Sequence, residues 1–317
     1  MIQTVLGPVP PERLGFCHSH EHLFLAPGRP AEIHPDLRID DFDLTLAELR
    51  QFYAAGGRAV VDAQPLGCGR MEAELVRASE LSGVHIAAST GFHKFAMYGE
   101  RHWIRRFAES ELRELFVGEL TKGMHVGTDR AEPGERISAR AGVLKTAVDE
   151  ERINDPDKRW FRAAAAAALE TGAPLLCHVE SAEQAEWLSN YYIGEGVPPD
   201  GIIICHLDRK LDRPDIHRKL LERGVYLEYD TIGRYKYHSD EEEARWIAGM
   251  LEAGWEDRLL AGLDTTRARL RAYGGTIGLT HIAASFLPLL RRCGATERQL
   301  SKLMIGNPAR AFRFRGR

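Results

Sequence analysis

The stretch Gly201-Ile202-Ile203-Ile204-Cys205-His206 is a continuous apolar run that ends in a histidine. Such runs are typical of parallel strands that are covered on both faces, because these strands have no side that faces water. The stretch Ala173-Pro174-Leu175-Leu176-Cys177-His178 has nearly the same form one unit earlier in the chain. We therefore expect two neighbouring buried strands, each of which ends in an imidazole.

Six further stretches of this kind lie on either side, and each predicted strand is followed by a segment with apolar residues at helical spacing. The other predicted strands span residues 15–22, 58–63, 84–90, 141–145, 224–229 and 258–264. The predicted helices span residues 44–54, 71–81, 109–121, 158–171, 182–192, 212–221, 240–252 and 279–292. Glycines between helix and strand predict left-handed helix C-caps at Gly56, Gly83, Gly172, Gly224 and Gly254.

Eight strand–helix units in 317 residues predict an α/β protein with the closed (β/α)8 TIM barrel fold. An open doubly wound sheet is the alternative, but it usually has fewer strands and a glycine-rich phosphate turn, and the sequence has neither a GxGxxG nor a Walker pattern. We see no internal repeat, low-complexity tract or linker. We therefore expect a single domain over residues 1–317, with a short N-terminal lead-in before the first barrel strand.

Composition excludes several classes of protein. The chain has 42 basic and 46 acidic residues and a formal net charge of −4, so it lacks the basic field that nucleic acids and anionic membranes attract. No apolar run approaches the roughly 20 residues of a membrane helix, and the N-terminus does not resemble a signal peptide. The five cysteines are widely spaced without a CxxC pair, which favours a reducing, cytoplasmic location.

His20 and His22 lie at the end of the first predicted barrel strand. Residues two apart in a strand point to the same face, so both imidazoles can face the barrel interior and bind one cation. The alternative is a pair of hydrogen-bonded polar residues at a strand end. Glu21 should point away and be structural. His18 shares the parity of His20 and should be a buried, hydrogen-bonded histidine deeper in the barrel.

His178 and His206 should lie side by side at the barrel mouth. An imidazole that follows several buried apolar residues is costly unless something binds it, so this pair also indicates a metal site. The preceding Cys177 and Cys205 have the opposite parity, and we expect them to face the helix layer as small buried hydrophobic residues.

Lys145 and Asp264 each end an apolar run. A buried carboxylate at Asp264 needs a cation. A desolvated lysine is neutral, and a neutral amine can add carbon dioxide to form a carbamate, an anion with two oxygens that can bridge two metals. The alternative is a Lys145–Asp264 salt bridge.

Together these residues resemble the amidohydrolase superfamily and, within it, the phosphotriesterase family, which includes phosphotriesterase-like lactonases. The resemblance runs from about residue 2 to residue 313. Its further motifs are Gln3-Thr4-Val5-Leu6-Gly7, Leu14-Gly15, Thr90-Gly91 and Asn307-Pro308-Ala309-Arg310.

The resemblance implies a binuclear metal centre. His20, His22 and Asp264 would hold the more buried ion, and His178 and His206 the more exposed one. Lys145, as N6-carboxylysine, and a hydroxide would bridge the two divalent ions, which are expected to be zinc, with manganese, cobalt and iron as alternatives. The hydroxide would attack the substrate, and Asp264 would take its proton and return it to the leaving alkoxide. Asp264 and Lys145 are thus the expected catalytic residues.

Five residues in the predicted loops are expected to bind substrate, and their basic side chains suit an anionic substrate. They are His93, Lys94, Arg234, Lys236 and Arg267. A branch of the family that hydrolyses phosphorylated sugar lactones has a lysine and an arginine at the positions of Lys236 and Arg267. The tyrosine that completes that phosphate site falls at Leu270 here, with Tyr273 and Lys94 as alternatives. Arg234 also resembles an arginine of lactonases with acyl-homoserine lactone activity. The alternative for each of these residues is a solvated loop charge.

The expected function is that of a binuclear metal-dependent hydrolase, a lactonase that opens a small anionic lactone. The alternatives are a phosphotriesterase or carboxylesterase with promiscuous organophosphate hydrolysis and, outside catalysis, a silent binding barrel. We expect a small-molecule substrate and no nucleic-acid or membrane partner. The family resemblance implies a homodimer.

Overall fold

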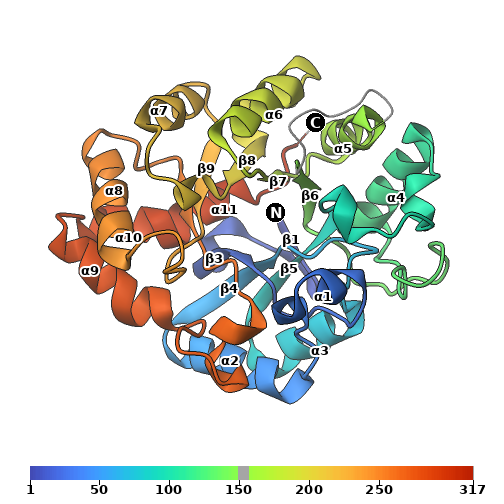
Figure 1. Cartoon of the computed structure of the whole chain (residues 1–317), viewed down its shortest axis with the longest axis horizontal. Coiled ribbons are helices and arrows are strands. Elements are labelled where there is room, and N and C mark those ends of the chain that lie inside the picture. The colour runs from blue at the N-terminus through green and yellow to red at the C-terminus, as the bar shows by residue number, and fades with distance from the viewer. Residues whose placement is uncertain (149–156, 317) are drawn as a thin grey trace.

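The computed structural model describes residues 1–148 and 157–316. Eight parallel strands form one sheet whose strand order follows the chain from β3 to β10. Helices surround this sheet as an outer ring (Figure 1), so the predicted (β/α)8 barrel is confirmed. The strands are β3 Phe16–Glu21, β4 Gly57–Asp62, β5 His85–Gly91, β6 Val143–Ala147, β7 Leu175–His178, β8 Ile202–Cys205, β9 Tyr226–Tyr229 and β10 Leu259–Ala261.

The helices agree closely with the predicted segments. They are α2 Phe42–Ala54, α3 Glu72–Ser82, α4 Glu109–Thr121, α5 Lys158–Thr171, α6 Ala182–Gly194, α7 Pro214–Glu222 and α8 Asp240–Glu252. The last predicted helix begins with a π-helical turn, Ile282–Phe286, before α9 Leu287–Arg292. The sequence did not predict the short helices α1 Arg29–Ile33, α10 Glu297–Ser301 and α11 Asn307–Ala311. All five glycines expected at helix ends have positive φ angles, as left-handed caps require.

The N-terminal lead-in is an antiparallel hairpin of β1 Ile2–Thr4 and β2 Gly7–Val9. Ile2 packs in the same apolar cluster as Phe312 near the C-terminus, together with the inward residues of the barrel strands such as Leu176 and Ile203. The barrel interior is therefore a filled core, and only the opposite rim is left for polar side chains.

Glu21 closes the barrel between its first and last strands. The backbone N–H of Asp264 donates to the carbonyl of His20 at 3.1 Å. The Glu21 carboxylate accepts hydrogen bonds from the backbone N–H groups of Leu263 at 3.0 Å and Thr265 at 3.3 Å. Gly262 permits the close approach, since a Cβ there would lie 2.8 Å from the His20 carbonyl oxygen. The structural role expected of Glu21 is confirmed.

Two expectations about side-chain direction were wrong in part. His18 is buried and its Nδ1 lies 2.8 Å from a Glu21 oxygen, as expected. However, its ring lies 4.6 Å from that of Phe52 on α2, so it packs against the helix layer and not inside the barrel. The pairing register between β3 and β4 shifts between His18 and Glu21, and this irregularity breaks the alternation that the parity argument assumed.

Cys205 is the second correction. Cys177 packs in the outer cluster between strands and helices, as expected. Cys205 instead lies in the barrel interior with Ile203. His206, the next residue, has a left-handed backbone with φ +66°. It has left the extended conformation, so the alternation of a strand does not require its imidazole to lie on the face opposite Cys205.

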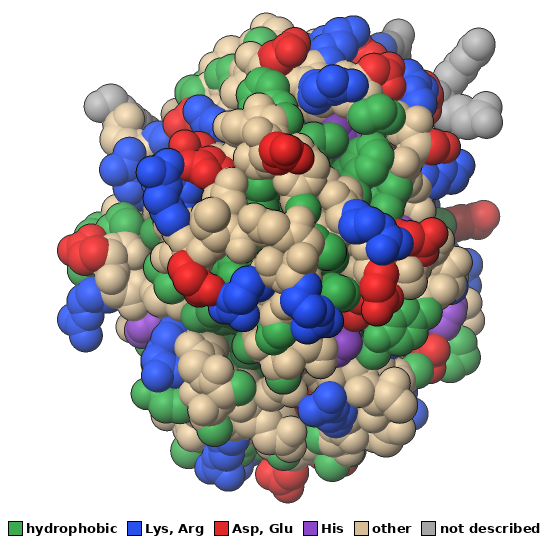
Figure 2. Space-filling view, turned by 90° about the vertical axis from the view of Figure 1, so that its left-hand side faces the viewer, with side chains coloured by type: hydrophobic (Ala, Val, Ile, Leu, Met, Phe, Trp, Pro, Cys, Tyr) green, Lys and Arg blue, Asp and Glu red, His purple; other side chains and the backbone are tan. Residues whose placement is uncertain are grey.

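The surface agrees with the nearly balanced charge of the chain. On the face over α8 and α9, Lys and Arg side chains lie scattered among Asp and Glu side chains (Figure 2). Among the described residues, no helix has both the length and the apolar character needed to cross a membrane.

Candidate metal centre and active site

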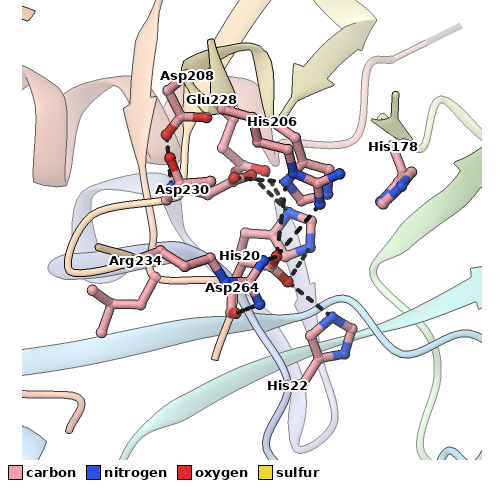
Figure 3. Close-up of polar contacts among 12 residues, drawn as sticks. His20, His22, His178, His206, Asp208, Glu228, Asp230, Arg234 and Asp264 are labelled. Atoms are coloured by element: carbon pink, nitrogen blue, oxygen red, sulfur yellow. Dashed lines mark hydrogen bonds and ion pairs between the residues drawn. The ribbon is translucent and has the colours of Figure 1, made fainter. Parts of the chain in front are cut away.

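Three of the expected ligands meet around Asp264 at the carboxyl ends of the barrel strands. Its Oδ1 lies 3.3 Å from Nε2 of His22 and 3.8 Å from Nε2 of His20. The Nζ of Lys145 lies 3.2 Å from the same nitrogen of His20. Figure 3 shows His20, His22 and Asp264 turned toward one another, with Arg234 reaching Asp264 from another side.

The two remaining expected ligands adjoin this group. The ring centroids of His178 and His206 lie 4.4 Å apart, and those of His206 and His20 lie 4.8 Å apart. All three imidazoles are buried. The structure therefore brings all six sequence-predicted ligands into one cluster, contributed by β3, β6, β7 and the segments that follow β8 and β10.

A carboxylate lies against one nitrogen of each of three imidazoles. His20 Nδ1 lies 2.7 Å from Glu228, and His206 Nδ1 lies 2.6 Å from Asp230. His178 Nε2 lies 2.9 Å from Glu180. A carboxylate accepts an N–H, so this nitrogen carries the proton and the other ring nitrogen keeps its lone pair. Metal-binding histidines are commonly fixed in this way.

These three carboxylates were not predicted from the sequence. The signal for Glu228 was present, because it interrupts the apolar stretch of β9, where an acid needs a buried partner. Asp230 follows the same strand directly. Glu180 lies two residues beyond His178 in a loop, and the loop conformation that returns it to the imidazole was not visible in the sequence.

Burial makes these imidazoles neutral. Loss of solvent is the largest cause that lowers the pKa of His20, and it lowers the pKa values of His178 and His206 well below the usual range. Burial alone would raise the pKa of Asp264, but the charge of the neighbouring Arg234 guanidinium opposes it, and that pKa lies well below its usual range. The cluster thus offers lone pairs and a carboxylate, the forms that bind divalent cations.

Lys145 is fully buried within this cluster. Within residues 1–148 and 157–316, no carboxylate oxygen lies within 4.0 Å of its Nζ, so the alternative Lys145–Asp264 salt bridge is not formed. The Nδ1 of His22 is also buried, and it has no hydrogen-bond partner in that part of the chain. A cluster of nitrogen and oxygen donors such as this one fits a site for divalent transition metals.

A cavity of about 300 Å³ lies over the cluster. Its lining includes His22, His178 and Asp264 and four of the five predicted substrate residues, namely His93, Lys94, Arg234 and Lys236. Lys94 pairs with Glu180. Arg234 donates to Asp264 Oδ2 at 2.6 Å and to the Asp264 carbonyl at 3.0 Å.

The fifth predicted substrate residue, Arg267, does not line this cavity. Its side chain is 43% exposed, lies 4.0 Å from Asp40 and covers the ring of Tyr273 at 5.3 Å. The Tyr273 hydroxyl bonds to Thr45 and to the carbonyl of Asp41, and Leu270 is buried. The expected phosphate triad is therefore not assembled at these positions.

The cavity wall also contains Arg209, which the sequence did not predict as a site residue. It lies in the 3-10 turn Leu207–Arg209, three residues beyond His206. Its guanidinium pairs with Glu180, and its Nη2 lies 3.8 Å from Asp264 Oδ2. Its position just after a strand-end histidine was the available signal.

The chain is similar to known proteins over almost its whole length. The model of the phosphotriesterase family matches residues 1–312. A phospho-furanose lactonase from Mycoplasmopsis synoviae is 29% identical, over 98% of this chain and 91% of the relative. An N-acetyltaurine hydrolase from Salmo salar is 27% identical, over 99% of this chain and 98% of that protein.

Solved structures are similar over almost the whole chain. A lactonase from Listeria monocytogenes is 27% identical with a TM-score of 0.89, and 99% of each chain is covered. A mutant of a phosphotriesterase-like lactonase from Deinococcus radiodurans is 33% identical with a TM-score of 0.82, over 98% of this chain and 100% of the other. The resemblance that the sequence motifs indicated is confirmed: this chain is a hydrolase that belongs to the phosphotriesterase family.

Proposed function

We propose that the protein is a binuclear metal-dependent lactonase that opens a small anionic lactone, such as a phosphorylated sugar lactone. The observation that carries this proposal is the convergence of six buried side chains with N and O donors beneath a cavity with a cationic wall. The relatives named phospho-furanose lactonase support it independently. We further propose that residues 1–317 form one catalytic domain.

The donor set supports two ions. His20, His22 and Asp264 would hold one ion, His178 and His206 the other, and a carboxylated Lys145 would contribute to both. Zinc suits these ligands, and manganese, cobalt and iron are alternatives. When bound, two divalent cations would supply a hydroxide nucleophile near neutral pH and polarise the substrate carbonyl.

Asp264 is the proposed proton carrier of the reaction. Its carboxylate would accept the proton of the nucleophile and return it to the leaving alkoxide. In a lactone the alkoxide stays attached to the acyl product, so it remains close to Asp264. Glu228, Asp230 and Glu180 would orient the imidazoles throughout, because each accepts an N–H from a ring nitrogen.

The charge of the cavity wall supports an anionic substrate. Among the described residues that line it, four are cationic side chains and two are carboxylates. A phosphate monoester carries nearly two negative charges at neutral pH, which matches this excess. The cavity size suits a molecule as small as a sugar lactone.

A second candidate is hydrolysis of a small anionic amide. The relatives named N-acetyltaurine hydrolase favour it, because they match this chain over 99% of its length. An organophosphate triester is less well matched to the wall, since it carries no negative charge.

One experiment compares these substrates. The enzyme is loaded with zinc or manganese, its metal content is measured by mass spectrometry, and it is assayed on a phosphorylated furanose lactone, the unphosphorylated lactone, N-acetyltaurine and paraoxon. We expect close to two ions per chain and the highest kcat/KM on the phosphorylated lactone. Higher kcat/KM on the amide would replace the lactonase proposal, and no hydrolysis by fully loaded enzyme would support a silent barrel.

A further inference from the structure

Residues 27–38 form a short excursion of the chain between β3 and α2, beside the cavity over the ligand cluster. The two ends of this segment meet at a pair of backbone hydrogen bonds. Leu25 N–H donates to the Ile39 carbonyl at 2.8 Å, and Ile39 N–H donates to the Leu25 carbonyl at 3.0 Å. The segment contains α1 and the 3-10 turn Pro35–Leu37. It begins soon after His22, so it is rooted next to the first two predicted metal ligands.

The polar contacts of this segment are local. Three side-chain contacts reach no further along the chain than residue 40, and they are Arg29 with Glu32, His34 with the Asp36 N–H, and Arg38 with Asp40. In the part of the chain that the structure describes, no hydrogen bond or ion pair ties residues 27–38 to the rest of the barrel. Apolar contacts hold the segment in place, and a segment held in this way opens at little cost in free energy.

The apolar side chains of the segment face the cavity. Pro30, Ile33 and Leu37 line it, and so does Met97, which lies in a turn that α1 contacts. Pro30 is buried and Leu37 packs against the main core, whereas Ile33 is 43% exposed. An exposed apolar side chain that lines a cavity becomes buried when a ligand fills that cavity, and this burial is favourable.

The composition of the segment favours movement as one unit. Pro27, Pro30 and Pro35 each have a φ angle that the proline ring fixes. Gly28 separates Pro27 from α1, and a Cβ at this position would have no heavy atom within 4 Å. Rotation is therefore easy at Gly28 and restricted within the segment itself.

We propose that residues 27–38 are a flap that closes over the bound substrate, and that Ile33 is the flap residue that contacts it. Closure would bury Ile33 against the substrate and keep bulk water away from the ligand cluster during the reaction. Because the contact is apolar, it recognises the carbon framework of a small substrate and not its anionic group. The inference rests on the proposed function, since it assigns a substrate contact in the same cavity.

The test compares Ile33→Ser with Ile305→Ser as the matched control. Ile305 is 40% exposed, lies in the π-helical turn Lys302–Gly306 and does not line the cavity. Each metal-loaded enzyme is assayed on a phosphorylated sugar lactone and on the same lactone without phosphate. We expect Ile33→Ser to lower kcat/KM about 10-fold on both substrates, because burial of an isoleucine side chain contributes a factor of about that size. Ile33→Leu should keep most of the activity, and Ile305→Ser should match the wild type.

Hydrogen exchange measures closure of the flap directly. Acetate and hexanoate are the probes, since both offer a carboxylate to the metals and only hexanoate carries an alkyl chain long enough to reach Ile33. In the metal-loaded wild type and in Ile305→Ser, we expect hexanoate to slow the exchange of the backbone amides of residues 27–38 more than acetate does. Ile33→Ser should show no such difference. Urea unfolding should give the same stability for all three proteins, because Ile33 lies outside the core.

These measurements separate the flap from the proposed function. If the wild type hydrolyses no lactone, the proposed function fails, whereas protection by hexanoate that Ile33→Ser loses still supports the flap. If lactonase activity is present but Ile33→Ser keeps wild-type kcat/KM on both substrates, the contact with Ile33 is overturned. Equal exchange of residues 27–38 with acetate and with hexanoate in the wild type overturns the flap too.

Discussion

Arg269 holds the backbone of Asp264 in a conformation that residues other than glycine rarely adopt. Asp264 has φ +46°, in the left-handed region. The Arg269 guanidinium donates to the Asp264 carbonyl at 3.1 Å, to the Ile232 carbonyl at 2.6 Å and to the Leu263 carbonyl. It thereby ties the loop after β10 to the loop after β9, which carries Arg234. Burial and the neighbouring Arg234 lower the Arg269 pKa to about 10.

Replacement of Arg269 should therefore displace the Asp264 carboxylate, although Asp264 itself is unchanged. Arg269→Met removes the guanidinium donor of the Ile232 and Leu263 carbonyls, while the Asp264 carbonyl keeps its bond from Arg234. Each such loss costs about 1–3 kcal/mol when the group is buried. We expect a clear loss of stability in urea and a fall in kcat of about 100-fold, because a small misplacement of a reacting group has effects of that size. Arg271→Met, in the next and exposed turn, is the control and should leave both unchanged. Wild-type kcat in Arg269→Met would show that the Asp264 backbone needs no such support.

The barrel and the ligand cluster were predictable because both depend on strand ends. Continuous apolar runs predicted parallel strands, and the residue that closes each run, such as His178 or Asp264, must lie at the common rim. The rule that successive side chains of a strand point to opposite faces failed for Cys205, because the next residue, His206, leaves the extended conformation.

The arginines after Asp264 show why loop residues were harder to predict. The resemblance pointed to Arg267, whereas the structure turns Arg269 inward and leaves Arg267 near Asp40. The two residues lie in one 3-10 turn. Which of them turns inward depends on the carbonyls of Ile232, Leu263 and Asp264, and no local pattern encodes such contacts.

Glu228 should control the metal affinity of His20. It accepts the Nδ1 proton, which leaves Nε2 facing Lys145 and Asp264. Glu228→Leu removes this acceptor, and loss of such a partner typically weakens metal binding 10- to 100-fold. Chelator competition monitored by metal analysis would measure the change. Glu228→Gln keeps an acceptor oxygen, so it should retain most of the affinity, and equal losses in both variants would argue against the orienting role.

Lys145 should carry a carbamate in the metal-loaded enzyme. A fully buried amine with no carboxylate within reach in the described residues is best accommodated as an anion between cations. Native mass spectrometry of the loaded protein should show the added mass of one carbon dioxide. Lys145→Ala should lose most of its metal and activity and regain part of both with added formate or acetate, which can occupy the vacated space. Full metal content in Lys145→Ala without added carboxylate would contradict the assignment.

His217 should make the fold less stable in acid through a site outside the metal cluster. It lies on α7 with its Nδ1 2.9 Å from the Tyr229 hydroxyl and its ring against Trp246 of α8. Burial lowers its pKa to about 4, although Asp212 and Asp215 oppose this shift. In the unfolded chain the pKa is about 6.5. Between these values the unfolded state binds a proton that the native state does not, so stability falls as pH decreases.

The contribution of this residue can be isolated with His217→Gln, which keeps a hydrogen-bonding side chain but does not titrate. The wild type should lose up to about 3 kcal/mol more unfolding free energy than the variant as pH falls from 7 to 4. Urea unfolding of the metal-free proteins at several pH values measures this difference. The histidines of the metal cluster are present in both proteins, so their contributions to the pH dependence cancel. Parallel stability curves for the two proteins would show that His217 is protonated in the native state at the same pH as in the unfolded chain.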